Sequence, residues 1–195
     1  MANSKISDLS AVTSLTSSDV LPIVNDSATR KVTTEELSSY AQLGWCRYDD
    51  TQYTSSNKLS LSDGVLVTLP NNAGSVTRSS AGIDFYDSSA QRLVADNEND
   101  CHVVTVVFKA SAANTNSTHL DFELVNGGVT GYERINKSLG FYKGNNTEQN
   151  FHEMFQFYAD ADFVENGAAI KIMADGGTAQ VWDIIFFIQR TQRYF

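Results

Sequence analysis

Histidine and acidic side chains at alternating positions are the first candidates for chemistry. In HLDFELV, His119, Asp121 and Glu123 alternate with apolar residues, so on a β-strand they would share one face and could ligate a cation. The solvated face of a sheet explains the same row equally well. The other two histidines, His102 and His152, show no H-E-x-x-H or other paired spacing. The sequence therefore predicts no metal centre and no bound cofactor.

Two further groups of carboxylates have spacings that resemble known sites. Asp160, Asp162 and Glu165 precede a glycine in DADFVENG, but this segment lacks the D-x-D-x-D-G run of a calcium-binding loop. Asp84 and Asp87 could imitate the carboxylate pair of a glycosidase, although any acidic β domain produces such pairs by chance. Neither group predicts a catalytic or metal site.

Motifs that carry enzymatic chemistry are missing from the sequence. It contains no G-x-S-x-G, no glycine-rich phosphate loop and no G-x-G-x-x-G. The aromatic residues of FHEMFQFYAD could line a sugar site, but their alternation assigns most of them to a core; they are Phe151, Phe155, Phe157 and Tyr158. We therefore expect a protein without enzymatic activity.

Composition excludes several classes of partner. The 195 residues carry a net charge of −9, with 14 Lys and Arg against 23 Asp and Glu, which argues against nucleic acid because phosphate binding needs clustered basic residues. No run approaches the roughly 18 apolar residues of a membrane span, so we expect no membrane partner. MANSKISDLS lacks the basic-then-apolar pattern of a secretory signal, which predicts a protein made in the cytoplasm without a signal peptide.

The two cysteines, Cys46 and Cys101, lie far apart in the sequence. Neither belongs to a C-x-x-C motif, so they support neither a metal site nor a redox site. Two free thiols are expected for a protein made in the cytosol, with a single disulfide as the alternative.

The elements that would position these residues are short β-strands over residues 41–195. Turn-forming residues such as Pro70-Asn71-Asn72 and Gly176-Gly177 separate the apolar runs. The predicted strands are 65–69, 82–87, 91–96, 101–111, 119–125, 151–160, 168–175 and 178–191. Their number and spacing, with little helical periodicity, predict a mainly β domain with the antiparallel, jelly-roll-like β-sandwich fold.

The strands predicted at 101–111 and 178–191 are apolar on both faces. In the first, Val104, Val106 and Phe108 oppose Val103 and Val107. In the second, one face is predicted to hold Trp182, Ile184, Phe186 and Ile188, and the other face Val181, Ile185 and Phe187. A strand that is apolar on both faces is covered on both faces. We interpret the face of Val181, Ile185 and Phe187 as a subunit interface, with a cover from the same chain as the alternative.

Residues 1–40 differ in composition from the rest of the chain, because they are rich in Ser and Thr, and we predict that they form an N-terminal arm. VLPIV and TRKVTT read as the two strands of a hairpin, with turn residues supplied by NDSAT, and an isolated hairpin needs another surface to pack on. Thr33 and Glu36 have the spacing of a capping box, which predicts a short helix after the hairpin. The residues expected to dock on a partner are Leu21, Ile23, Val24, Arg30, Lys31 and Val32.

This arm resembles a segment of known proteins. KISDL, a Ser/Thr-rich spacer, LTSSDVLPIV, a polar turn and RKVTTEEL are together similar to the N-terminal segment of tailed-bacteriophage head-decoration and tail-fibre proteins. In those families the segment helps to attach the protein to the virion or to start a trimer. The resemblance covers Lys5 to Leu37 and implies a virion component, a homotrimer, and other virion proteins, such as the major capsid protein, as partners.

The two halves together predict a non-enzymatic virion structural protein. A trimeric capsid-decorating protein, of the cement or head-fibre type, is favoured because one compact domain without fibrous repeats or heptads has little reach. The alternative is a short tail-fibre or receptor-binding protein that recognises host glycan through its loops. A third interpretation is a free-standing carbohydrate-binding β-sandwich module.

Overall fold

The computed structural model describes residues 20–25, 28–33, 43–78, 83–127 and 133–193. The chain divides into two compact units, Met1–Gln42 and Leu43–Phe195. Within the described residues, no helix combines the length and the apolar character that crossing a membrane would require.

The first unit contains the hairpin that the sequence predicts. Strand β1 (Val20–Asn25) pairs antiparallel with β2 (Ala28–Thr33), and Pro22 lies opposite Lys31. Lys31 is exposed and Val32 is half-buried. The helix predicted after Thr33 falls on residues 34–42, outside the described part of the chain. The same is true of the side chains of the other expected docking residues, Leu21, Ile23, Val24 and Arg30.

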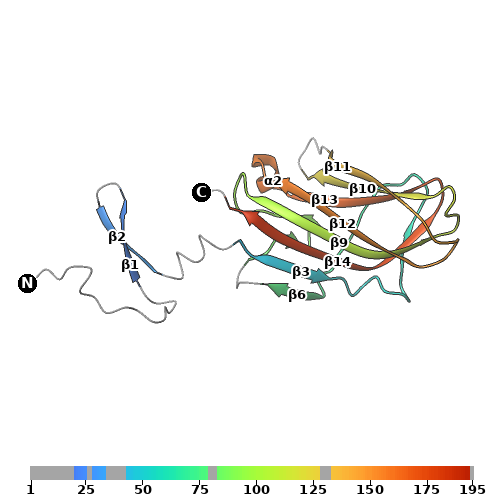
Figure 1. Ribbon diagram of the computed structural model, residues 1–195, viewed down its shortest axis with the longest axis horizontal. Helices are drawn as coiled ribbons and strands as arrows, with labels where there is room; N and C mark the ends of the chain where they lie inside the picture. Colours follow the sequence, from blue (N-terminus) through green and yellow to red (C-terminus); the bar gives the residue numbers. More distant parts are fainter. Residues whose placement is uncertain (1–19, 26–27, 34–42, 79–82, 128–132, 194–195) are drawn as a thin grey trace, which may run out of the picture. The chain divides into compact units, whose positions relative to one another are not determined.

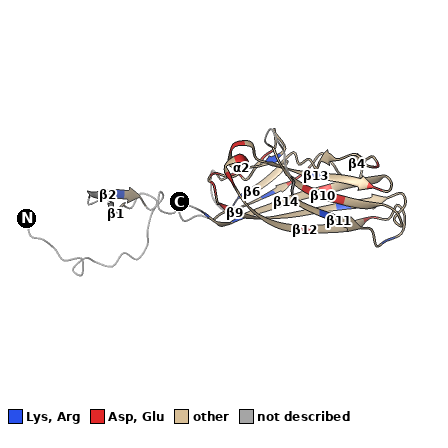
Figure 2. Cartoon of the chain, turned by 90° about the horizontal axis from the view of Figure 1, so that it is seen from above, with Lys and Arg blue, Asp and Glu red and all other residues tan. Residues whose placement is uncertain are grey.

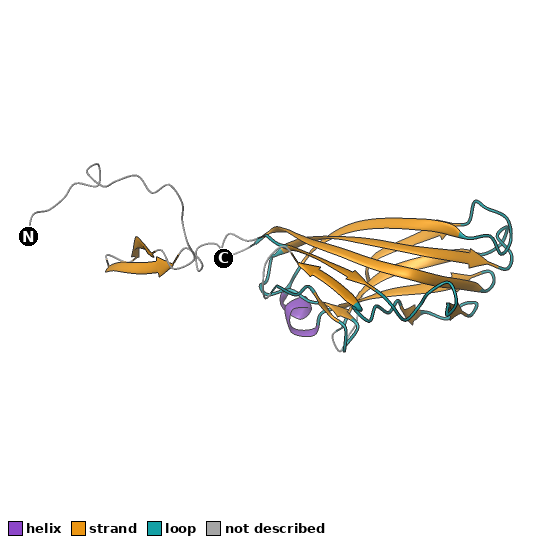
Figure 3. Cartoon of the chain, turned by 90° about the horizontal axis from the view of Figure 1, so that it is seen from below, coloured by secondary structure: helices purple, strands orange, loops and turns teal. Residues whose placement is uncertain are grey.

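The second unit is a sandwich of two antiparallel sheets (Figures 1 and 3). One sheet has the order β11-β10-β13-β8-β7, with β5 also paired to β13. Its strands are β5 (Val67–Thr68), β7 (Tyr86–Asp87), β8 (Arg92–Leu93), β10 (His119–Asn126), β11 (Glu133–Gly140) and β13 (Ala168–Asp175). This confirms the predicted antiparallel β-sandwich.

The other sheet has the order β12-β9-β14-β3-β6, with β4 also paired to β14. Its strands are β3 (Trp45–Asp49), β4 (Leu59–Leu61), β6 (Ser75–Arg78), β9 (Cys101–Ala112), β12 (Gln149–Tyr158) and β14 (Ala179–Gln192). The described helix α2 (Ala161–Asn166) connects β12 to β13 (Figure 3).

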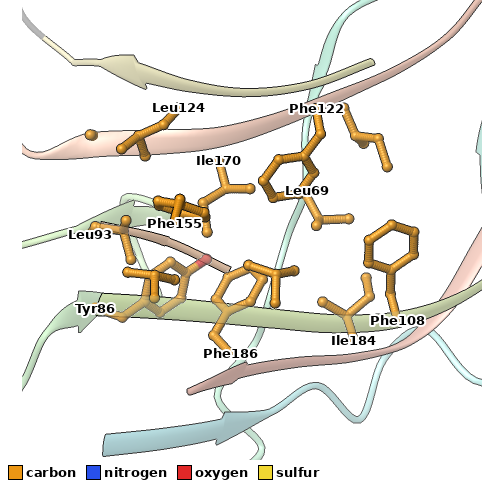
Figure 4. Packing of buried hydrophobic residues seen from close by; sticks show 14 of the residues in the cluster. Leu69, Tyr86, Leu93, Phe108, Phe122, Leu124, Phe155, Ile170, Ile184 and Phe186 are labelled. Atoms are coloured by element: carbon orange, nitrogen blue, oxygen red, sulfur yellow. The ribbon is translucent and has the colours of Figure 1, made fainter. Parts of the chain in front are cut away.

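The core lies between the two sheets and follows the period-two alternation of the long strands. On β10, Leu120, Phe122 and Leu124 are buried, as predicted. In Figure 4, Phe122 and Ile170 come from one sheet, and Phe155, Phe108, Ile184 and Phe186 come from the other sheet. The rings of Phe108 and Phe151 stack with their centroids 5.1 Å apart. Burying each such side chain contributes about 1.5–3 kcal/mol, so this shared interior holds the two sheets together.

Several predicted strands are shorter in the structure. Of the runs 65–69, 82–87 and 91–96, only two residues each pair in a sheet. Leu69, Phe85 and Leu93 nevertheless fill the core. These runs are apolar because their side chains are needed inside, while most of their backbone forms loops. Conversely, β11 was not predicted because ERINKSLG is an edge strand without apolar alternation.

A bulge in β14 reverses the predicted facing of its first half. The register places Val181 opposite Ala110 and Ile185 opposite Val107, with a shift between Trp182 and Ile185. At the bulge Asp183 has φ 52°, and its N–H donates to the Tyr53 carbonyl at 2.9 Å. Because one residue is inserted, the side-chain alternation changes phase. The assignment of Val181 to the second face is therefore wrong: it is fully buried in the core.

The same bulge moves Trp182 to the other side of the sheet. Trp182 lies opposite Lys109, on the side that faces away from the core, together with Ile185 and Phe187. It is only 1 % exposed, and the ammonium of Lys58 lies 3.9 Å from the centre of its ring. A cover from the same chain thus protects this end of the face, whereas Ile185 and Phe187 are half-buried.

Candidate functional site

The candidate site is the side of the β12-β9-β14-β3-β6 sheet that points away from the core. We call it the outer face and define it by the partly exposed apolar residues that the register places there beside the covered Trp182: Trp45, Val103, Val107, Met154, Tyr158, Ile185 and Phe187. Met154 and Tyr158 are 60 % and 57 % exposed, and the other five are half-buried. Ile185 and Phe187 lie on this face as predicted.

Cross-strand pairing makes these residues contiguous. Phe187 of β14 lies opposite Thr105 of β9, and Ile185 lies opposite Val107. On the other side of β14, Phe187 contacts the ring of Trp45 in a stacked arrangement with centroids 5.6 Å apart. Apolar side chains from neighbouring strands therefore form one surface, which is the arrangement that a protein partner can cover.

Ion pairs lie beside the apolar part of the outer face. The Lys109 ammonium lies 3.2 Å from carboxylate oxygens of both Glu148 and Asp183, and these hydrogen bonds raise the pKa of Lys109. Arg47 pairs with Asp49 at 2.8 Å. Because exposed pairs contribute little to stability, their effect here is to fix the direction of charged groups next to the apolar surface. Figure 2 shows where the charged residues lie along the strands.

The histidine group is composed differently from the prediction. His119 Nε2 lies 3.6 Å from Asp121 Oδ1 and 3.3 Å from Asp175 Oδ2, and the three ligand atoms lie within 4.8 Å of one another. Asp175 enters the group because β13 places it directly opposite His119. Glu123, the third residue of the predicted row, instead accepts from the amide of Asn136 at 3.4 Å. The group can hold a cation or, with His119 protonated, form two ion pairs.

The two other acidic groups have structural roles. Asp160 is the N-cap of α2 and accepts from the Phe163 N–H at 2.8 Å. Asp84 accepts from the Arg78 guanidinium at 2.8 Å and from the Tyr48 hydroxyl at 3.2 Å. Asp87 accepts from Ser89 and Ala90 in a turn, and these bonds lower its pKa. Asp160, Asp84 and Asp87 are thus each engaged in local structure.

The remaining sequence candidates are also placed. Phe151, Phe155 and Phe157 are buried in the core, as their alternation predicts, while Tyr158 is on the outer face. Cys46 is buried and Cys101 is half-buried, and both are free thiols, as expected.

Sequence reasoning missed a buried charged group near the start of the second unit. Arg190 is completely buried; its Nη1 lies 2.8 Å from Asp96 and 3.2 Å from Asp100, and its Nε donates to the Leu43 carbonyl. His102 of β9 lies directly opposite Arg190 on the neighbouring strand β14. Burial lowers the pKa of His102 to about 4, because removal from water disfavours the charged imidazole and the Arg190 charge acts in the same direction. The only signal was one arginine in an apolar strand.

Comparison with known proteins locates the fold but not a family. No protein-family model matches the sequence of this chain, and no curated protein matches it either. Among solved structures, the PRD1 vertex protein P5 is similar over 97 % of this chain and 91 % of that one, with 10 % identity and a TM-score of 0.50. Eiger TNF from S. frugiperda matches over 78 % of this chain and 94 % of that one, with 6 % identity and a TM-score of 0.49. The infectious bursal disease virus VP2 subviral particle matches over 92 % of this chain and 40 % of that one, with 9 % identity and a TM-score of 0.41. The likeness to the vertex protein extends along both chains and establishes a shared fold.

Proposed function

We propose that this chain is a non-enzymatic virion structural protein that forms a homotrimer and decorates the capsid surface. The outer face is the observation that carries the proposal. The fold shared with the PRD1 vertex protein and the resemblance of Lys5–Leu37 to phage attachment segments support it. In this proposal the second unit assembles and the N-terminal arm attaches, with other virion proteins as its partners.

The occupant that best fits the outer face is the same face or edge of an identical chain. Most soluble oligomers are closed assemblies of identical subunits, so an apolar surface on one copy is available on every copy. Ile185, Phe187 and Val107 are already half-covered by neighbours within the chain. Covering the remainder removes apolar area from water at about 25 cal/mol for each Å². The ion pairs at Lys109 and Arg47 add a polar border, as protein interfaces have.

Sedimentation velocity of the purified chain tests the assembly. We expect a trimer, and we expect Phe187→Asp to give monomer or aggregate, because a carboxylate buried without a partner costs several kcal/mol. Val65→Asp is the matched control, since Val65 is 49 % exposed and lies outside the outer face. A soluble trimer with Phe187→Asp would exclude the outer face as the interface.

Copy number in purified virions tests the location. Quantitative mass spectrometry against the major capsid protein should give hundreds of copies for a capsid-decorating protein, and about a dozen for a tail component. The tail-fibre or receptor-binding alternative is favoured by a separate observation, the polar pocket described in the next section. Absence from virions would exclude both and leave a free-standing sandwich module.

A further inference from the structure

A pocket of about 380 Å³ lies at the end of the sandwich opposite to Trp45. Gln180, near the start of β14, lies in its lining, whereas Trp45 pairs with Gln189 near the end of the same strand. At about 3.3 Å per residue, Gln180 and Gln189 lie roughly 30 Å apart along this strand. The pocket is therefore at the end of the sandwich that is remote from Trp45, and its volume is in the range of small-molecule sites.

Neutral polar side chains make up most of the lining, and Leu61, Ala113 and Ala179 form its apolar part. Gln180 lies directly between Ser60 of β4 and Ser111 of β9, so these three side chains form one row across adjacent strands. Ser62, Thr178 and Asn146 complete the polar part of the lining. None of these six side chains hydrogen-bonds another described residue, so their hydroxyl and amide groups are available. Ser111 is only 7 % exposed and is one of the residues that line the pocket.

Backbone hydrogen bonds join the segments that line the pocket. The Asn146 N–H donates to the Ala112 carbonyl at 2.7 Å, which ties its loop to the end of β9. The Ala113 N–H donates to the Thr178 carbonyl at 3.3 Å, which joins the ends of β9 and β14. A ligand therefore meets donors and acceptors that are already positioned, which lowers the entropic cost of binding.

The chemistry of the lining selects one class of ligand. A charged ligand would lose hydration without gaining an opposite charge, because no lining residue is acidic or basic. An apolar ligand would leave the hydroxyl and amide groups without partners. A neutral molecule with several hydroxyls satisfies both, since hydroxyls donate and accept, and each amide offers two donors and one acceptor. We propose that this pocket binds a neutral saccharide unit. The proposal goes beyond the capsid-decorating role and does not depend on it.

Saturation-transfer difference NMR on the purified full-length chain tests the proposal. The probes are glucose, galactose, mannose, N-acetylglucosamine and, as a charged sugar, glucuronate; an array of neutral oligosaccharides extends the set. We expect a saturable signal from at least one neutral probe and none from glucuronate. Gln180→Ala should weaken that binding about fivefold or more, the effect of one lost hydrogen bond. Gln52→Ala, an exposed amide outside the lining, is the matched control and should bind like the unchanged chain.

A second variant is needed in case the ligand keeps its affinity by forming other hydrogen bonds when Gln180 is removed. Ser111→Val removes the buried hydroxyl and fills space in the pocket while keeping a residue suited to a strand, so it should abolish the signal with the β spectrum unchanged. The proposal is overturned if no neutral probe binds, if Gln180→Ala and Ser111→Val both bind normally, or if glucuronate binds as well as the neutral sugars. Virion copy number, measured separately, reports on the proposed function and is unaffected by any of these results.

Discussion

The guanidinium of Arg190 and the carboxylate of Asp100 form an ion pair that is fully buried on both sides, at 3.2 Å. Asp96, the other acidic partner of Arg190, has a side chain that is 53 % exposed. One arginine thus joins a buried carboxylate to a solvated one beside the Leu43 carbonyl. The stability of the sandwich near Leu43 therefore depends on this pair, because removing one partner would leave the other as an uncompensated buried charge.

Removing the buried partner should therefore destabilise the protein far more than removing the exposed one. We expect Asp100→Asn to lower the free energy of unfolding by about 3 kcal/mol, since it leaves Arg190 without its buried counter-charge. Asp96→Asn should lower it by less than about 1 kcal/mol, because the partner is solvated. Urea denaturation of both variants measures the difference. If both variants lost the same free energy of unfolding, the burial of Asp100 would not be the cause of its larger expected effect.

Stability should fall in mild acid because of His102. Its pKa is about 4 in the folded chain, below the ordinary 6.5, so the unfolded chain binds the proton more readily. The contribution of His102 to the free energy of unfolding is fully present above pH 6.5 and decreases as the pH falls toward 4. The total decrease over that window is about 3 kcal/mol. Chemical denaturation at a series of pH values measures it.

The variant that isolates this effect is His102→Phe, which keeps an aromatic ring beside Phe85 and Phe157 but cannot titrate. It should be less sensitive to pH between 6.5 and 4 than the unchanged chain, while His152→Gln, at an exposed position, should retain the full dependence. An identical pH profile for His102→Phe and the unchanged chain would remove His102 as the cause.

Two glycines with similar backbone angles should respond differently to alanine. Gly176 and Gly64 have φ of 78° and 68°, which an alanine adopts only with strain. A Cβ on Gly176 would lie 2.2 Å from the Ser117 carbonyl oxygen, whereas a Cβ on Gly64 meets nothing within 4 Å. We expect Gly64→Ala to cost about 1 kcal/mol and Gly176→Ala at least about 2 kcal/mol more, measured by thermal denaturation. Similar melting temperatures for the two would show that the chain at Ser117 moves freely aside.

A chain that lacks residues 1–40 should still fold. The buried hydrophobic cluster of the described residues lies within the second unit, so we expect its β spectrum and its cooperative melting to persist. It should fail to rejoin virions that lack the native protein, because the apolar residues Leu21, Ile23, Val24 and Val32 are then missing from the docking surface. The full-length chain is the control.

Two outcomes would contradict that role. If the truncated chain decorates particles as well as the full-length chain does, the arm takes no part in attachment. If the truncated chain fails to fold or to trimerise, the arm serves assembly of the protein itself. Co-sedimentation with particles and sedimentation velocity of the truncated chain distinguish these cases.

Local alternation was enough to predict much of the sandwich. In HLDFELV the period of two assigned Leu120, Phe122 and Leu124 to the core, and the structure confirms this because β10 is regular and one of its faces is buried. The strands that became β9 and β13 were predicted to within about a residue for the same reason. The hairpin of β1 and β2 followed from its polar turn, since turn residues act over a few positions of the chain.

What depended on contacts between distant residues was decided only by the tertiary structure. The bulge at Asp183 is held by the Tyr53 carbonyl, and it moved Val181 into the core and Trp182 out of it. Asp175 lies beside His119 because β10 pairs with β13. Ser60, Ser111 and Gln180 line one pocket because β14 pairs with both β4 and β9. A sequence pattern records which way a side chain points along its own strand. Which strand lies beside it, and in which register, depends on hydrogen bonds and packing between segments that are far apart in the chain.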